Sequence, residues 1–157
     1  MEFLKDLFGN YWLDSVIAGW IVAQILKVFT GVFRQREFSV RAMLFGNGGM
    51  PSSHTASVAA LATANAVTEG FGSIPFAIAA LLAIVVMNDA IGVRREAGKH
   101  SQALNQLMSE RAKELKEEPL EFFRELMGHT PLQVFFGLLT GVAVALLMSL
   151  IPVFGIY

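Results

Sequence analysis

The chain has 157 residues, of which 54% are hydrophobic and 16% are charged, and its formal net charge is −1 at pH 7. This composition is much more apolar than that of a water-soluble globular domain, so we expect an integral membrane protein. The chain has no cysteine, which excludes both a disulfide framework and a thiolate metal site.

Four apolar stretches are long enough to cross a membrane, because the ~30 Å hydrocarbon core of a bilayer takes about 20 residues of helix. They cover residues 11–33, 53–70, 74–93 and 131–157. The sequence therefore predicts one all-α membrane domain over residues 1–157, built as a bundle of about four transmembrane helices.

The basic residues are distributed unevenly between the connecting segments. Of the 12 Lys and Arg residues, three lie between the first and second spans and seven between the third and fourth. Both basic loops fall on the same face of a four-span bundle, and the positive-inside rule predicts that this face is cytoplasmic. We therefore expect a multi-pass integral membrane protein with its basic loops and its active site on the cytoplasmic face.

The first span carries Lys27 near its basic end. Ionisable groups at membrane depth are rare and often functional. A lysine close to the interface can instead extend its amine to the lipid headgroups. The sequence leaves both interpretations open.

The second span is preceded by the segment GGMPSSHT, residues 48–55. Gly49 permits a close approach of the backbone, and Ser52 or Ser53 is a natural N-cap. A helix N-terminus binds anions, and His54 lies in its first turn. The segment is thus a candidate anion site, and the simpler alternative is a capped helix with an interfacial histidine. The second span is rich in alanine, and small residues let helix backbones approach closely, so we expect this helix at the centre of the bundle.

The third span ends in NDAIGVRR, residues 88–95. Arginine suits bidentate binding of phosphate, so Arg94 and Arg95 are candidate phosphate ligands. A purely structural alternative pairs Asp89 with one of these arginines.

An amphipathic segment follows from about residue 100 to residue 127, where apolar residues recur at helical spacing. The pattern predicts a cytoplasmic helix that lies along the membrane or folds over the bundle. A solvated connector and a lid over the substrate are both compatible with it.

The fourth span begins at GHTP, residues 128–131, where Thr130 is the expected N-cap and Pro131 occupies the first turn. His129 therefore lies at the start of one span, as His54 does at the start of another. Further along, Gly137 and Gly141 have the GxxxG spacing, which allows a close helix contact within the chain or across a homodimer.

Two histidines, two helix N-termini and two arginines are thus predicted to meet at one membrane face. This set of groups suits phosphoryl transfer, in which one histidine attacks phosphorus and the other protonates the leaving oxygen. The His and Asp positions show no metal-ligand spacing. We therefore expect no metal and no cofactor.

The motifs GGMPSSHTA, DAIGVRREAG and GHTPLQVFFG resemble the signatures of the divergent PAP2 family. These small membrane proteins are related to type 2 phosphatidic acid phosphatases and vanadium-dependent haloperoxidases. The similarity covers nearly the whole chain, with the three motifs in the same order. It implies a metal-independent phosphatase that acts on an isoprenoid or glycerophospholipid phosphate through a phosphohistidine.

The resemblance also implies roles for individual residues. Pro51 to His54 resembles the PSGH element, with Ser53 in place of glycine, which makes His54 the general acid. His129 is the implied nucleophile, although Gln133 stands where an orienting acid is expected, and Asp89 is the candidate to replace that acid through space. His100 is the alternative nucleophile. The implied substrate-binding residues are Lys27, Arg34, Gly49, Ser52, Ser53, Arg94 and Arg95.

We expect a phosphorylated lipid as the substrate, surrounding membrane lipids as the other partners, and no nucleic acid. Two further hypotheses remain open. One is a non-catalytic membrane protein that binds or translocates phosphorylated lipids with the same site. The other is a membrane scaffold whose histidines are merely interfacial.

Overall fold

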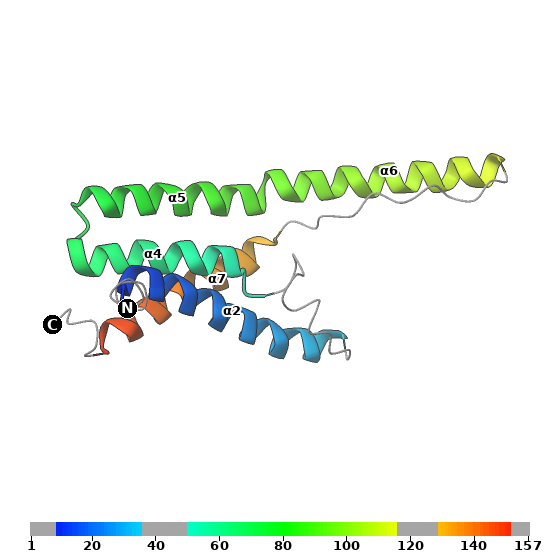
Figure 1. Cartoon of the computed structure of the whole chain (residues 1–157). Helices are drawn as coiled ribbons and strands as arrows, with labels where there is room; N and C mark the ends of the chain where they lie inside the picture. The colour runs from blue at the N-terminus through cyan, green and yellow to red at the C-terminus, as the bar shows by residue number, and fades with distance from the viewer. Residues whose placement is uncertain (1–8, 36–49, 116–128, 152–157) are drawn as a thin grey trace, which may run out of the picture.

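The computed structural model describes residues 9–35, 50–115 and 129–151, with the side chains of 31–35 and of Arg94 left out. Over these residues the fold is all-α (Figure 1). The helices are α2 (Tyr11–Gln35), α4 (Ser53–Glu69), α5 (Ile74–Ile91), α6 (Val93–Leu115) and α7 (Pro131–Ser149). The all-α prediction is confirmed, and four of these helices fall on the four apolar stretches.

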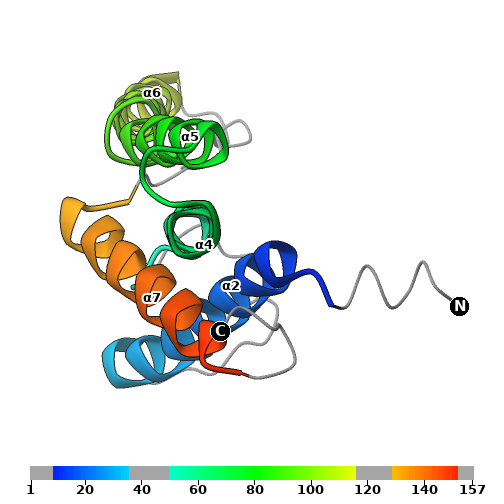
Figure 2. The same cartoon turned by 90° about the vertical axis from the view of Figure 1, so that its left-hand side faces the viewer.

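Helix α4 is the centre of the bundle and contacts α2, α5 and α7. Figure 2 shows it between α5 on one side and the pair α2 and α7 on the other. Ala56, Ala60 and Ala64 on α4 have no exposed surface. The small side chains let the neighbouring backbones approach, so the predicted central position of this helix is confirmed.

Glycines on the neighbouring helices complete the close packing. A Cβ atom on Gly137 of α7 would lie 2.5 Å from the carbonyl oxygen of Ser52, and one on Gly141 would collide with the carbonyl oxygen of Ala56. On α2, a Cβ atom on Gly19 would lie 3.2 Å from the carbonyl oxygen of Ala56. The GxxxG pair of α7 is therefore used for a contact within the chain.

Three candidate membrane spans lie in the described residues, at Tyr11–Thr30, within Ile74–Leu115 and at Pro131–Ser149. Their large apolar side chains point outward, for example Phe29 on α2, Leu81 on α5 and Phe135 on α7. Helix α4 has 17 residues and is not among the three. At 1.5 Å per residue it is about 26 Å long, so the count of four spans stays a prediction. The end of the last predicted span, residues 152–157, lies outside the described residues.

Helix α6 continues beyond the bundle in the direction of α5 (Figure 1). It begins at Val93, earlier than the amphipathic pattern predicts, and meets α5 where it continues from the end of that helix. Helix α6 therefore leads away from the bundle and does not fold over it, because Gly92 interrupts the helix without reversing the chain. Residues 116–128 of the predicted segment lie outside the described residues.

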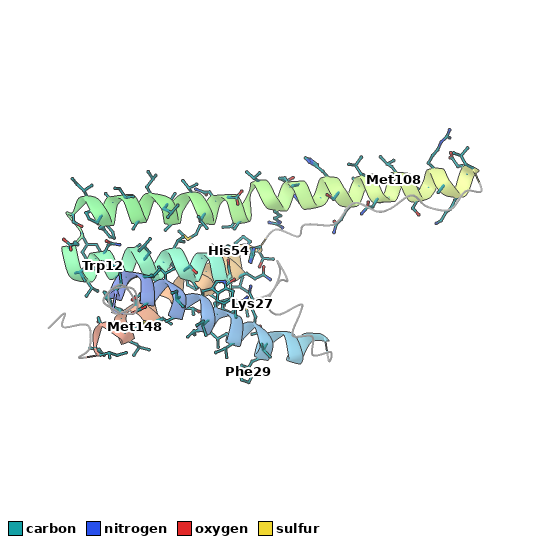
Figure 3. All side chains as sticks on the ribbon, viewed as in Figure 1. Trp12, Lys27, Phe29, His54, Met108 and Met148 are labelled. Carbon is teal, nitrogen blue, oxygen red and sulfur yellow. The ribbon has the colours of Figure 1, made fainter. Side chains whose placement is uncertain are left out.

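Two side-chain hydrogen bonds tie α2 to its neighbours at its first turn. The Tyr11 hydroxyl donates to the carbonyl oxygen of Ala145 at 2.8 Å, and the Trp12 indole N–H donates to Thr68 Oγ1 at 3.0 Å. Figure 3 shows Trp12 at the opposite end of the bundle from Lys27 and His54. Tyr and Trp are enriched at membrane interfaces, so these residues indicate the level of the interface at that end.

Candidate functional site

The starts of α4 and α7 and the end of α5 meet at one end of the bundle (Figure 1). Two backbone hydrogen bonds join them. The Ser52 N–H donates to the carbonyl oxygen of Gln133 at 3.0 Å, and the His129 N–H donates to the carbonyl oxygen of Ala90 at 3.1 Å. The three sequence motifs, far apart along the chain, are thus parts of one structural unit.

Ser52 is the N-cap of α4, as the sequence predicts. Its Oγ accepts from the backbone N–H of Thr55 at 3.4 Å and lies 3.0 Å from the Thr55 hydroxyl. Ser52 has no exposed surface. Its hydroxyl therefore stabilises the start of α4 from inside the packed contact with α7.

Lys27 extends from α2 to the start of α4. Its Nζ donates to Ser53 Oγ at 3.1 Å, and the lysine is half-buried. Figure 3 shows Lys27 and His54 at the same end of the bundle. An ammonium group and the positive end of the α4 dipole thus lie together, which is a favourable environment for an anion. The Lys27 amine thus lies against the start of α4.

The two histidines have different environments. His54 is exposed in the first turn of α4. His129 directly precedes the N-cap of α7 and is only 4% exposed. Because the His129 backbone is bonded to Ala90, this residue is held between α5 and α7, while His54 is accessible from outside the bundle.

Gln133 forms a capping box with Thr130. Its Oε1 accepts from the Thr130 backbone N–H at 2.9 Å, and its own N–H donates to Thr130 Oγ1 at 3.3 Å. The predicted cap at Thr130 is confirmed, and the Gln133 amide belongs to it. The half-buried Asp89 directly precedes Ala90, whose carbonyl accepts from the His129 N–H. The fold thus brings an acid close to the His129 backbone.

Comparison with known proteins shows the family of the chain. The sequence model of the Divergent PAP2 family matches residues 8–144. The chain belongs to the Divergent PAP2 family. It is 36% identical over 154 residues, 92% of this chain and 97% of the relative, to the uncharacterized membrane protein YuiD of Bacillus subtilis (strain 168). No solved structure matches the chain. The relative's description and the three candidate spans place this divergent PAP2 protein in a membrane.

The remaining predicted site residues of this divergent PAP2 protein either lie on α6 or fall outside the described part of the chain. Arg95 is exposed in the first turn of α6. Gly49 lies outside the described residues, as do the side chains of Arg34 and Arg94. His100 is exposed on α6, which leads away from the bundle. The starts of α4 and α7, which carry His54 and His129, are therefore joined at one end of the bundle, with Lys27 bonded to Ser53 there, whereas His100 lies on α6.

Sequence reasoning missed one residue of this end of the divergent PAP2 bundle. Thr30 on α2 has its Oγ1 2.5 Å from the carbonyl oxygen of Met50, just before the start of α4. Its position three residues after Lys27 puts both on one face of α2, and this spacing was the available signal. Among the described residues, no three or more His, Cys, Asp or Glu side chains are grouped so that they could hold a metal ion.

Proposed function

We propose that this divergent PAP2 protein is a membrane phosphatase that hydrolyses a lipid phosphate ester through a phosphohistidine. One observation carries the proposal. The helix starts that bear His54 and His129 are joined by the Ser52 to Gln133 hydrogen bond, beside the ammonium group of Lys27. A general acid, a nucleophile and a cation are therefore available at two joined helix starts.

In the proposed reaction, the phosphate docks at the start of α4, where the helix dipole and Lys27 balance its charge. A nitrogen of His129 attacks phosphorus as the bond to the lipid oxygen breaks, and His54 donates a proton to that oxygen. Water then attacks the phosphohistidine, and His54 accepts the proton of this water. The products are a lipid alcohol and inorganic phosphate.

The surroundings of the site favour a lipid as the substrate. The outward faces of α2, α5 and α7 are apolar, as expected for helices in contact with acyl chains. The starts of α4 and α7 lie at one end of this apolar bundle (Figure 1), so a phosphate there would sit near the level of lipid headgroups. Isoprenoid and glycerophospholipid phosphates both meet this requirement.

A second candidate function is binding or translocation of phosphorylated lipids without hydrolysis. It is favoured by the capping box, because Gln133 is neutral and its Oε1 is bonded to the Thr130 N–H. A neutral partner stabilises a developing imidazolium less than a carboxylate does. In that case the same helix starts and Lys27 would hold the phosphate without transferring it.

The experiment replaces each of the three histidines with asparagine. Phosphate release from prenyl and glycerolipid phosphates is measured with detergent-purified protein, and tryptophan fluorescence on heating checks folding. We expect His54→Asn and His129→Asn to lower kcat by roughly two to four orders of magnitude. His100→Asn is the matched control and keeps its activity, because His100 lies on α6 away from the site.

Two results would contradict the proposal. Activity that survives loss of His129 but not of His100 would move the nucleophile to α6. Retention of a phosphorylated lipid by the wild type, without release of phosphate from any substrate in the panel, would support the binding function instead.

A further inference from the structure

The segment that leads into His54 is held at three points by two different helices. The carbonyl oxygen of Met50 is bonded to Thr30 of α2, and the N–H of Ser52 to the carbonyl oxygen of Gln133 on α7. The Oγ of Ser53 is bonded to Lys27 of α2. The position of His54 therefore depends on contacts that lie one to four residues before it.

Thr30 has three acceptors within reach of its single hydroxyl proton. The carbonyl oxygens of Leu26 and Lys27, in its own helix, lie 3.1 Å and 3.2 Å from Oγ1, whereas that of Met50 lies at 2.5 Å. A threonine in a helix commonly bonds back to its own preceding turn. The shorter distance indicates that this hydroxyl bonds across to the segment before α4.

We propose that Thr30 is a positioning residue for His54. It holds Met50 against α2, while Lys27, one turn earlier on the same face, holds Ser53. Together the two side chains fix the segment from Met50 to Ser53, and with it the start of α4, against α2. Thr30 acts through the Met50 carbonyl and does not touch the substrate. Its effect on catalysis rests on the proposed phosphatase function, whereas its hold on the segment does not.

The labelling of an introduced thiol tests whether Thr30 fixes the segment at Met50, and it requires no measurement of activity. The chain has no cysteine, so Met50→Cys introduces a single thiol, at a half-buried position. We measure its rate of labelling by a maleimide in detergent. Thr30→Val, which keeps the shape of the side chain but removes the donor, should raise this rate roughly fivefold, as expected for loss of one hydrogen bond. Thr30→Ser should restore it.

Thr140→Val is the matched control. The Thr140 hydroxyl donates to the carbonyl oxygen of Phe136 in its own helix at 2.7 Å, so its loss should leave the labelling of the introduced thiol unchanged. An equal rise in both valine variants, or no rise in Thr30→Val, would overturn the proposal. The unfolding midpoint of each variant is measured in parallel.

Kinetics test the consequence for the reaction. Thr30→Val should lower kcat roughly fivefold at unchanged KM. The substitution makes the position of the general acid His54 less fixed, but it neither adds nor removes a contact with the substrate. Thr30→Ser should recover kcat. Faster labelling with an unaltered kcat would overturn the positioning role. A wild type that hydrolyses no substrate in the panel contradicts the proposed function, and the labelling rates then still decide whether Thr30 holds the segment.

Discussion

Gln133 joins the starts of two helices through three of its own atoms. Its main-chain N–H and side-chain Oε1 form the capping box with Thr130, and its carbonyl oxygen accepts from the N–H of Ser52. The first two interactions shape the start of α7, and the third joins it to the start of α4. Gln133 therefore has a structural role, in the cap of α7 and in its junction with α4, that by itself explains an amide at this position.

We predict that Gln133→Ala destabilises the protein by about 0.3–1.5 kcal/mol, the usual contribution of such a cap. Gln133→Glu should retain the stability of the wild type, because glutamate serves the same capping box. Thermal unfolding in detergent, followed by tryptophan fluorescence, measures both variants. An alanine variant with an unchanged midpoint and a reduced kcat would show instead that Gln133 acts mainly on His129.

The packing of α4 shows how one helix can organise a bundle through small side chains. Its alanines meet glycines on α2 and α7, so backbone lies nearly against backbone. In lipid, where apolar burial between helices gives little driving force, such close van der Waals contact stabilises the bundle. The same close packing positions the candidate site, because Gly137 of α7 packs on Ser52, the N-cap of α4.

We predict that Gly141→Ala destabilises the bundle by about 1–3 kcal/mol, the usual cost of overpacking. The added Cβ would collide with the backbone of Ala56, which cannot move without shifting α4. Gly72→Ala is the control, since a Cβ there meets no atom within 4 Å. If both variants unfold at the same temperature in detergent, the close contact between α4 and α7 is not a determinant of stability.

At the scale of the whole molecule, the candidate site and the α4–α5 turn lie at opposite ends of the bundle. The turn contains Gly72, and α6 with Lys99 follows the other end of α5 (Figure 1). If α5 crosses the membrane, these two residues face different compartments. The distribution of basic residues predicts that Lys99 faces the cytoplasm.

We predict opposite accessibility for single cysteines at these two positions. In intact cells a membrane-impermeant maleimide should label Gly72→Cys, whereas Lys99→Cys should be labelled only after the cells are opened. Loss of the exposed ion pair between Lys99 and Glu96 should cost little. Labelling of Lys99→Cys alone in intact cells would reverse the orientation, and labelling of both would contradict a span at α5.

Much of the fold follows from local patterns in the sequence. The apolar stretches predict α2, α5 and α7 to within a few residues, apart from the end of the last span, which lies outside the described residues. Ser52 and Thr130 are the caps expected from their types and positions. The amphipathic segment was less well predicted. Helix α6 begins at Val93, directly after Gly92 at the end of α5, so the polar residues that precede the amphipathic pattern are already helical.

The sequence by itself therefore determined the membrane character, the helices and their caps, and it singled out His54, Asp89 and His129. These features depend on composition and on residues within one or two turns of each other. Only the tertiary structure decided that the GxxxG glycines pack inside the chain, that Lys27 meets Ser53, that Gln133 belongs to a cap and that Thr30 meets Met50. Three of these four are contacts between segments distant in sequence, and no local spacing encodes which helix faces which.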